Sequence, residues 1–219
     1  PATPLGGIEA RAAGYLAAGS YDMTPEREYA AIRNAAALID VSPLLKYRIS
    51  GPDAARLLNR MVTRDASKCA VGQMLYTPWC DADGKVIDDG TVARLDEDVY
   101  RLTSAEPNLR WLHLNARGLS VKIEDISDAT AALALQGPNA RDILNELTRC
   151  TVDGLKYFRL LSTRLKDIPV TISRTGYTGD LGYEIWVDAR NAARLWDALM
   201  AAGDAYGITP TGILALDLA

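Results

Sequence analysis

The hydrophobic positions along the chain predict helices and strands in mixed order. A first helix is expected to begin at Thr24 and Pro25, because threonine caps a helix and proline fits its first turn, and to continue through Leu38. Further helices are expected to follow Gly51 and to span residues 107–115, 138–148 and 191–205. Strands are expected near 45–49, 76–95, 99–103, 119–126, 130–136, 157–165, 170–174 and 182–187. Mixing of this kind favours the α+β class.

One segment recurs along the chain. Residues 49–59 (ISGPDAARLLN) resemble residues 135–145 (LQGPNARDILN), and both predict a strand that passes through Gly-Pro into an amphipathic helix. A common strand-to-helix turn can produce this likeness by coincidence. The alternative is an internal repeat that builds two related α+β lobes, which we place at 1–128 and 129–219. A cleft between lobes is a usual place for a ligand.

Charge and residue usage restrict the chemistry that the chain can perform. The formal net charge of -4 argues against nucleic acid or a membrane surface as the main partner. His113 is the only histidine, which disfavours a serine or cysteine triad and a histidine-ligated metal site. Cys69, Cys80 and Cys150 are widely spaced and odd in number, which fits reduced thiols in the cytoplasm. We therefore expect carboxylates, tyrosines and a bound cofactor to carry the chemistry, without a metal.

Two adjacent aspartates lie inside the predicted hairpin that turns at residues 81–84. Asp88 and Asp89 are unusual because aspartate is depleted in strands. Successive strand residues face opposite sides, so we expect one carboxylate to face solvent and the other to find partners on the covered side. An extended turn with two solvated acids is an equally weighted alternative.

The segment from Arg174 to Glu184 (RTGYTGDLGYE) is rich in glycine. Glycines at every third residue permit tight turns or close approach of the backbone to a ligand. Glu184 lies in a predicted strand, where a buried carboxylate is a suitable acceptor for a planar heterocycle with two adjacent N–H donors. A hairpin ion pair with Arg174 is the simpler alternative. The aromatic residues that could flank a flat ring are Tyr76, Tyr157, Phe158 and Tyr177, although each alone is more typical of a core.

Several motifs occur in the order found in one known family. They are DVS at 40–42, GPDA at 51–54, GKVIDD at 84–89, LQGP at 135–138 and the segment 174–184, with TPL at 3–5 and WDAL at 196–199. In these motifs the chain resembles the aminomethyltransferase (glycine cleavage T-protein) family over nearly its whole length. The resemblance implies two lobes around a central channel that holds tetrahydrofolate. It also implies a C-terminal β-barrel domain, which we expect this chain to lack.

The resemblance implies a role for six residues. Asp89 matches the essential aspartate that contacts the reactive folate nitrogens, and Glu184 matches the glutamate that binds the pterin. Tyr76, Thr91 and Tyr177 match positions lining the pterin pocket, and Phe158 lies where an aromatic wall is expected. The implied activity is transfer of a one-carbon unit from a small methyl or aminomethyl donor to tetrahydrofolate, with a lipoyl carrier protein as a partner.

Three departures from the motifs of glycine cleavage enzymes favour the family's broader branch. The chain has Pro43 after DVS, TSAE at 103–106 in place of an Asn-Ala strand end, and Leu216 where an arginine is usual. The broader branch includes folate-dependent demethylases and the folate domains of dimethylglycine and sarcosine dehydrogenases. The expected function is thus folate-dependent one-carbon transfer. The alternatives are a folate-binding module without catalysis, for instance one that serves an oxidase, and a structural protein that has lost the ligand.

Overall fold

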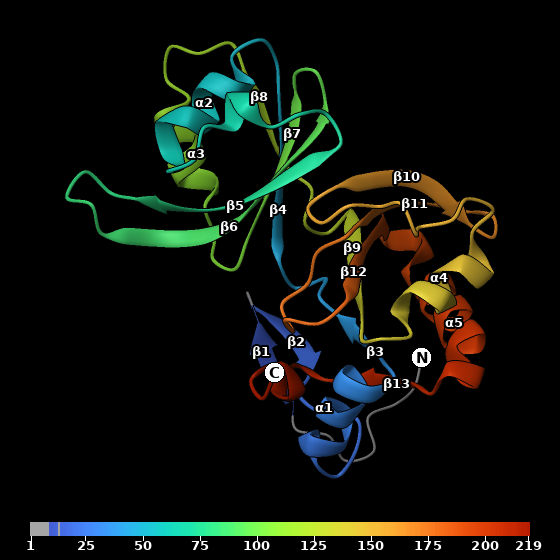
Figure 1. Ribbon diagram of the computed structural model, residues 1–219. Helices are drawn as coiled ribbons and strands as arrows, with labels where there is room; N and C mark the ends of the chain where they lie inside the picture. Colours follow the sequence, from blue (N-terminus) through green and yellow to red (C-terminus); the bar gives the residue numbers. More distant parts are fainter. Residues whose placement is uncertain (1–8, 13) are drawn as a thin grey trace. The chain divides into compact units, whose positions relative to one another are not determined.

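The computed structural model describes residues 9–12 and 14–219 of the chain (Figure 1). The described strands form a six-stranded, a five-stranded and a two-stranded sheet, and helices accompany the two larger sheets. This mixture of helices with mainly antiparallel strands confirms the α+β expectation. Within the described residues, no helix has the length and apolar character needed to cross a bilayer.

The chain divides into two compact units. Unit 2 is the continuous segment Pro43–Asp128, and unit 1 combines the chain up to Ser42 with Ala129–Ala219. The end of unit 2 coincides with the expected boundary at 128/129. The expectation that the first 42 residues join the first lobe is wrong, because β3 (Ala36–Asp40) pairs with β9 (Thr130–Gln136) in the sheet of unit 1. Each unit is described by itself below.

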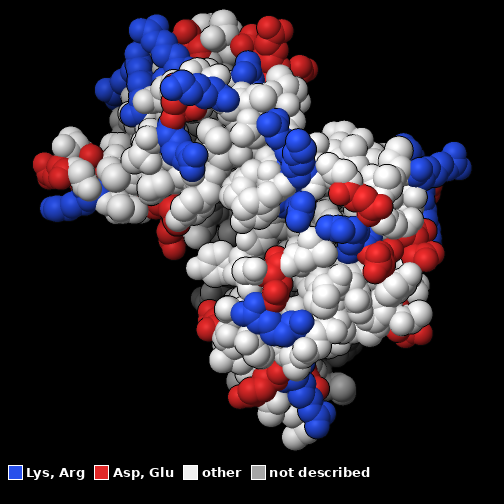
Figure 2. Space-filling model, viewed as in Figure 1, with Lys and Arg blue, Asp and Glu red and all other residues white. Residues whose placement is uncertain are grey.

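Unit 2 is an antiparallel sheet that carries helices on one face. Its strands lie in the order β5-β6-β7-β4-β8. The elements are β4 (Leu45–Ser50), α2 (Ala54–Met61), η1 (Ala66–Lys68), β5 (Gln73–Cys80), β6 (Val86–Asp96), β7 (Val99–Ser104), α3 (Leu109–Asn115) and β8 (Lys122–Asp125). Strands β5 and β6 extend beyond the others as a long hairpin (Figure 1). Basic side chains gather around α2 and α3 on the face shown in Figure 2.

The core of unit 2 follows from alternation along its strands. Tyr47 and Ile49 in β4 and Leu102 in β7 are fully or almost fully buried, as the predicted period of two requires. Leu57 and Leu58 of α2 are also buried, which matches an amphipathic helix lying on that sheet face.

The larger sheet of unit 1 carries helices on both faces, and β1 (Glu9–Ala12) and β2 (Tyr15–Ala18) form a separate two-stranded sheet. The strands of the larger sheet lie in the order β10-β11-β12-β9-β3-β13, in which only β13 and β3 run parallel. The further elements are α1 (Pro25–Asn34), α4 (Ala140–Leu147), β10 (Leu160–Leu165), β11 (Ile168–Ser173), β12 (Gly182–Asp188), η2 (Ala189–Asn191), α5 (Ala192–Gly203), η3 (Asp204–Tyr206), β13 (Ile208–Thr211) and α6 (Ile213–Leu216).

Alternation divides the core of unit 1 between the two faces of this sheet. Leu38 and Leu133 pack in the larger cluster with side chains of α4 and α5. Their neighbours Ile39 and Ala134 pack on the other face in a smaller cluster with Ile32 of α1. Figure 1 shows the same arrangement, with α1 and the α4–α5 pair on different sides of the sheet. Side chains at odd and even positions of β9 and β12 therefore lie on opposite faces of the sheet.

The expected helix to Leu38 is wrong in its last part. The helix ends at Asn34, and Ala35 has φ -143° and ψ -107°, outside the helical region. Ala36–Asp40 instead forms β3, whose positions 36–39 are buried between β9 and β13. Alanine favours helices, but pairing with two distant strands outweighs that local preference. Strand β13, which completes this pairing, is not predicted from the sequence.

Candidate functional site

The two adjacent aspartates of unit 2 face opposite sides of β6, as alternation predicts. Asp88 is half-buried, and its Oδ2 accepts hydrogen bonds from Asn108 Nδ2 at 2.7 Å and from the Glu106 backbone N–H at 3.1 Å. Asp89 is exposed. The covered carboxylate thus has the partners that its burial requires, and Asp89 remains available to a ligand.

Three of the predicted site residues lie together on the face of β5 and β6 that carries Asp89. Tyr76 and Thr91 are cross-strand partners, and Asp89 precedes Thr91 by two residues, so all three side chains share one face. The Tyr76 hydroxyl donates a hydrogen bond to Asp89 Oδ2. Tyr76 is 48 % exposed, so ring and carboxylate are both accessible. The hairpin therefore presents an oriented carboxylate beside an aromatic ring.

In unit 1, Glu184 carries the second predicted carboxylate. It is half-buried in β12 and pairs with Ser173 of β11. The Thr175 hydroxyl donates to Glu184 Oε2 at 2.6 Å, and the Ser173 and Thr175 hydroxyls lie 2.8 Å apart. Trp186 Nε1 donates to Ser173 Oγ at 3.2 Å. A chain of donors thus orients the carboxylate. The guanidinium of Arg174, the alternative partner, donates to the Leu155 carbonyl at 3.2 Å.

The glycine spacing of residues 174–184 has a cause that the sequence did not reveal. A Cβ added at Gly176 or Gly182 would lie 2.1 or 2.0 Å from the side-chain oxygen of Gln136. Gln136 is buried, its Nε2 donates to the Thr175 and Tyr183 carbonyls, and its Oε1 accepts from the Thr178 hydroxyl at 3.0 Å. These two glycines therefore make room for a buried amide. Gly179, with φ +74°, forms the expected tight turn.

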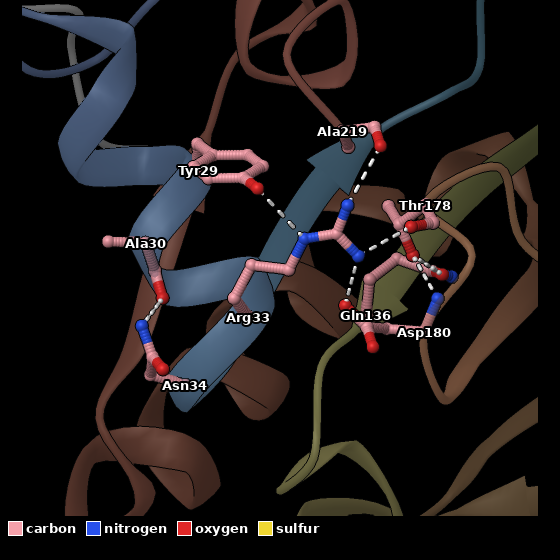
Figure 3. A network of polar contacts seen from close by, with 8 residues as sticks. All are labelled: Tyr29, Ala30, Arg33, Asn34, Gln136, Thr178, Asp180 and Ala219. Atoms are coloured by element: carbon pink, nitrogen blue, oxygen red, sulfur yellow. Dashed lines mark hydrogen bonds and ion pairs between the residues drawn. The ribbon is translucent and has the colours of Figure 1, made fainter.

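A second anchor of this loop comes from α1. Arg33 Nη1 donates to the Thr178 carbonyl at 2.9 Å and to Asp180 Oδ2 at 2.5 Å, while Nη2 donates to the Ala219 carbonyl at 2.8 Å (Figure 3). The hydrogen bond to Asp180, followed by that to Tyr29, raises the pKa of Arg33. Sequence reasoning missed Arg33 because its loop partners are distant along the chain and belong to no shared motif.

A cavity of about 290 Å³ lies beside the loop. It is lined by Tyr157, Arg174, Thr175, Gly176, Gly179, Asp180, Leu181 and Gly182. The predicted residues Tyr177, Phe158 and Glu184 are neighbours of this lining rather than part of it. Tyr177 is 85 % exposed, and Phe158, with φ 57°, packs edge-on against Tyr157 at a ring distance of 4.6 Å. Over the described residues, no three His, Cys, Asp or Glu side chains gather in a way that suits a metal ion.

Comparison with known proteins places this geometry in a family. The model described as the GCVT N-terminal domain matches residues 5–219. An aminomethyltransferase from Halothermothrix orenii is 39% identical over 194 residues, covering 87% of this chain and 54% of that protein. A trimethylamine-oxide aldolase from Ruegeria pomeroyi is 37% identical over 205 residues, covering 89% of this chain and 26% of that protein.

A solved structure agrees with these relatives. The glycine cleavage system aminomethyltransferase T from Bartonella henselae superimposes with a TM-score of 0.85 at 25% identity, covering 97% of this chain and 57% of that one. The chain spans about half the length of the aminomethyltransferases that it matches. The matched family model and the level of identity show that the chain belongs to the aminomethyltransferase (glycine cleavage T-protein) family.

Proposed function

We propose that this chain is the folate-binding region of an enzyme that transfers a one-carbon unit from a small amine or methylated donor to tetrahydrofolate. The observation that carries the proposal is the grouping of Tyr76, Asp89 and Thr91 on one face of the β5–β6 hairpin. Family membership supports the reaction class, because the Halothermothrix relative is named an aminomethyltransferase.

The residues of unit 1 fit a pterin ring in their chemistry. A pterin presents adjacent N–H donors, and the Glu184 carboxylate is an acceptor that Thr175 holds in one orientation at 2.6 Å. We assign Glu184 to binding these donors, with Tyr177 and Phe158 as aromatic walls. Arg33 and Gln136 would keep the 176–181 loop in place, so that little ordering is needed when the ring binds.

In unit 2 we assign the chemistry to Asp89. Bound tetrahydrofolate supplies the nitrogen atoms that accept the one-carbon unit. Positive charge develops on an attacking nitrogen, and the Asp89 carboxylate is suited to stabilise that charge and to accept a proton at Oδ. The Tyr76 hydroxyl, which donates to Oδ2, fixes the direction of the carboxylate, while the Tyr76 ring and Thr91 supply an aromatic face and a hydroxyl on the same face of the hairpin for contact with the folate. Orientation of the reacting groups is the larger part of the expected rate gain.

The donor and the partner are the finer parts of the proposal. We favour demethylation of a small methylated compound over glycine cleavage, because Leu216 stands where glycine cleavage enzymes usually carry an arginine. A lipoyl carrier protein is the expected partner if the donor is an aminomethyl group. Cys69, Cys80 and Cys150 form no disulfide among the described residues, which supports a reducing compartment such as the cytoplasm.

The proposal is tested by Asp89→Asn in the complete protein that contains this chain. Asparagine keeps an oxygen for the Tyr76 hydroxyl but removes the negative charge. Methyl or aminomethyl transfer to tetrahydrofolate, followed by mass spectrometry of the folate product, is expected to fall about 10²- to 10⁴-fold. Asp83→Asn, in the exposed turn of the same hairpin, is the matched control and leaves the rate unchanged. Undiminished transfer by the Asp89 variant would overturn the assignment.

A binding module without its own catalysis is the second candidate. The chain covers only 26% of the Ruegeria aldolase, so a segment of this family also occurs as a small part of a much longer enzyme. Folate affinity and turnover measured on one sample distinguish the two functions. Tight folate binding that Glu184→Gln weakens, together with no transfer from lipoyl-aminomethyl, dimethylglycine, sarcosine or sulfonium donors, would favour the module.

A further inference from the structure

Unit 1 contains a second cavity, of about 170 Å³, on the side of the sheet that carries α5. Its walls include Tyr21, Asp40, Ser42, Leu133 and Trp196. Asp40 pairs with Leu133 across β3 and β9, and Leu133 packs in the core cluster that includes α4 and α5 side chains.

This cavity is separate from the predicted pterin site of unit 1. Glu184 pairs with Ala134, whose side chain packs on the opposite face of the sheet with Ile32 of α1. Residues 133 and 134 thus point to different faces, and each face has its own candidate site. A ligand in the second cavity would therefore not contact the Glu184 side of the sheet.

The cavity carries a negative charge. The Asp40 side chain is exposed, and its Oδ1 accepts a hydrogen bond from the Ser42 backbone N–H at 2.9 Å. Among the side chains that the structure describes, none forms an ion pair with Asp40. The arginines beside the start of α5 are paired elsewhere, Arg190 with Asp188 and Arg194 with Asp167.

Aromatic rings form a second wall of the cavity. The ring centroids of Tyr21 and Trp196 lie 6.1 Å apart with an interplanar angle of 31°. Tyr21 and Asp40 line the same cavity, and burial, followed by the charges of Asp40 and Glu28, raises the pKa of Tyr21. Aromatic faces attract organic cations through their quadrupole, and a nearby carboxylate adds to the attraction.

We propose that this cavity binds a small methylated ammonium group. Leu133 and Ala192 supply apolar surface for methyl groups, the rings of Tyr21 and Trp196 supply cation–π attraction, and Asp40 supplies the opposite charge. A divalent metal ion needs more oxygen ligands than the Asp40 carboxylate and the Ser42 and Tyr21 hydroxyls offer. A primary ammonium is strongly hydrated and loses more on entering an apolar cavity. The inference is independent of the proposed folate chemistry.

Calorimetric titration of the full chain with choline, in the absence of folate, tests the inference. The uncharged isostere 3,3-dimethylbutan-1-ol has the same shape and is expected to bind about tenfold more weakly. Asp40→Asn keeps the oxygen that accepts from Ser42 N–H, so the turn is retained, and it should weaken choline binding about tenfold. Asp197→Asn, an exposed acid on α5, is the matched control and should bind choline like the unaltered chain.

A second pair of variants examines the aromatic wall. Trp196→Leu should weaken choline binding several-fold while Trp196→Phe retains most of it, because phenylalanine keeps a ring face. Thermal melting of each variant shows whether the fold is intact. The inference is overturned if choline does not bind, if the neutral isostere binds as tightly, or if Asp40→Asn leaves choline affinity unchanged. None of these outcomes depends on folate transfer.

Discussion

Unit 2 and unit 1 share four strands in one order, β5-β6-β7-β4 and β10-β11-β12-β9. In each unit a strand passes through Gly-Pro into an eight-residue helix, α2 or α4, which contacts a second helix, α3 or α5. The fifth strand is β8 in unit 2 and β3 in unit 1. The repeat predicted from two similar segments therefore extends over the main framework of both units.

The likeness reaches individual hydrogen bonds. Gly51 and Gly137 have φ of +120° and +121°, and a Cβ on either would lie 2.7 Å from a backbone carbonyl oxygen. The helix residues Asn59 and Asn145 each use Oδ1 to accept a backbone N–H seven residues further along the chain, from Ala66 and Val152. One turn chemistry thus serves both units, which coincidence between unrelated segments would not produce.

The differences lie where we propose function. Strands β5 and β6 have 8 and 11 residues, whereas β10 and β11 have 6 each, and the longer hairpin is the one that carries Asp89. Glu184 of β12 occupies the position that corresponds to Arg101 of β7. Glu184 follows Tyr183, which pairs with β9, and Arg101 follows Tyr100, which pairs with β4. Both β9 and β4 lead into a Gly-Pro turn. A common framework therefore carries unlike chemistry at equivalent positions.

The largest expected effect comes from adding a methyl group to either repeat glycine. Gly51→Ala and Gly137→Ala should each destabilise their unit by about 3 kcal/mol, because positive φ and a 2.7 Å contact with backbone both disfavour alanine. Hydrogen exchange read separately on α2 and α4 measures each effect, and Gly14→Ala, in open space at φ +85°, controls for the backbone angle alone. Faster exchange in only one of the two helices would show that the turns are not equivalent.

A slightly smaller loss of stability is expected on replacing Glu28, a residue of unit 1. Its fully buried carboxylate accepts backbone N–H groups of Tyr21, Asp22 and Gly212 and the hydroxyl of Ser20. Glu28→Gln places an NH₂ group against these donors and should cost about 2–3 kcal/mol in urea unfolding. Exposed Glu26→Gln on the same helix is the control. An unchanged midpoint for Glu28→Gln would contradict the role of this clamp.

The matched asparagines should show equal, moderate effects. Asn59 Nδ2 donates to Asp65 at 3.0 Å and Asn145 Nδ2 donates to Asp153 at 2.9 Å, in addition to the backbone bonds of their oxygens. Asn59→Ala and Asn145→Ala should each cost about 1–2 kcal/mol, measured by urea unfolding and assigned to a unit by hydrogen exchange. If one variant lost several times more stability than the other, Asn59 and Asn145 would not have equivalent roles in the two units.

The smallest expected effect is a pH dependence of folding stability that is caused by Asp65. Hydrogen bonds from Ser67 and then Asn59 lower the pKa of Asp65 from 3.8 to about 2. The resulting stabilisation is complete above about pH 4 and is lost as the pH falls through about 2. Asp65→Asn should therefore be less stable than the unaltered chain at pH 6 and nearly equal to it near pH 2. A difference that stays constant over this range would exclude Asp65 as its source.

Local signals explain what the sequence predicted well. The Gly-Pro turns and the long hairpin depend on neighbouring residues, so pattern alone predicts them, whereas it leaves the facing of Asp88 and Asp89 open between a strand and an extended turn. The pattern extends the predicted helix wrongly through Leu38, because the partners of Ala36–Leu38 in β9 and β13 are far along the chain. Gln136 was unrecognised for the same reason: its contacts with Gly176 and Gly182 exist only after the sheet has formed. Long-range pairing carries no local signature.

The insertion of unit 2 as one uninterrupted segment has a consequence for protein synthesis. Pro43–Asp128 emerges from the ribosome in full before Ala129–Ala219, so unit 2 can complete its sheet while unit 1 still lacks most of its strands. The buried apolar run of β3 emerges early but waits for β9 and finally β13 before it is paired on both sides. During translation this short strand therefore stays unpaired while unit 2 is completed, and chaperone binding there would limit premature association.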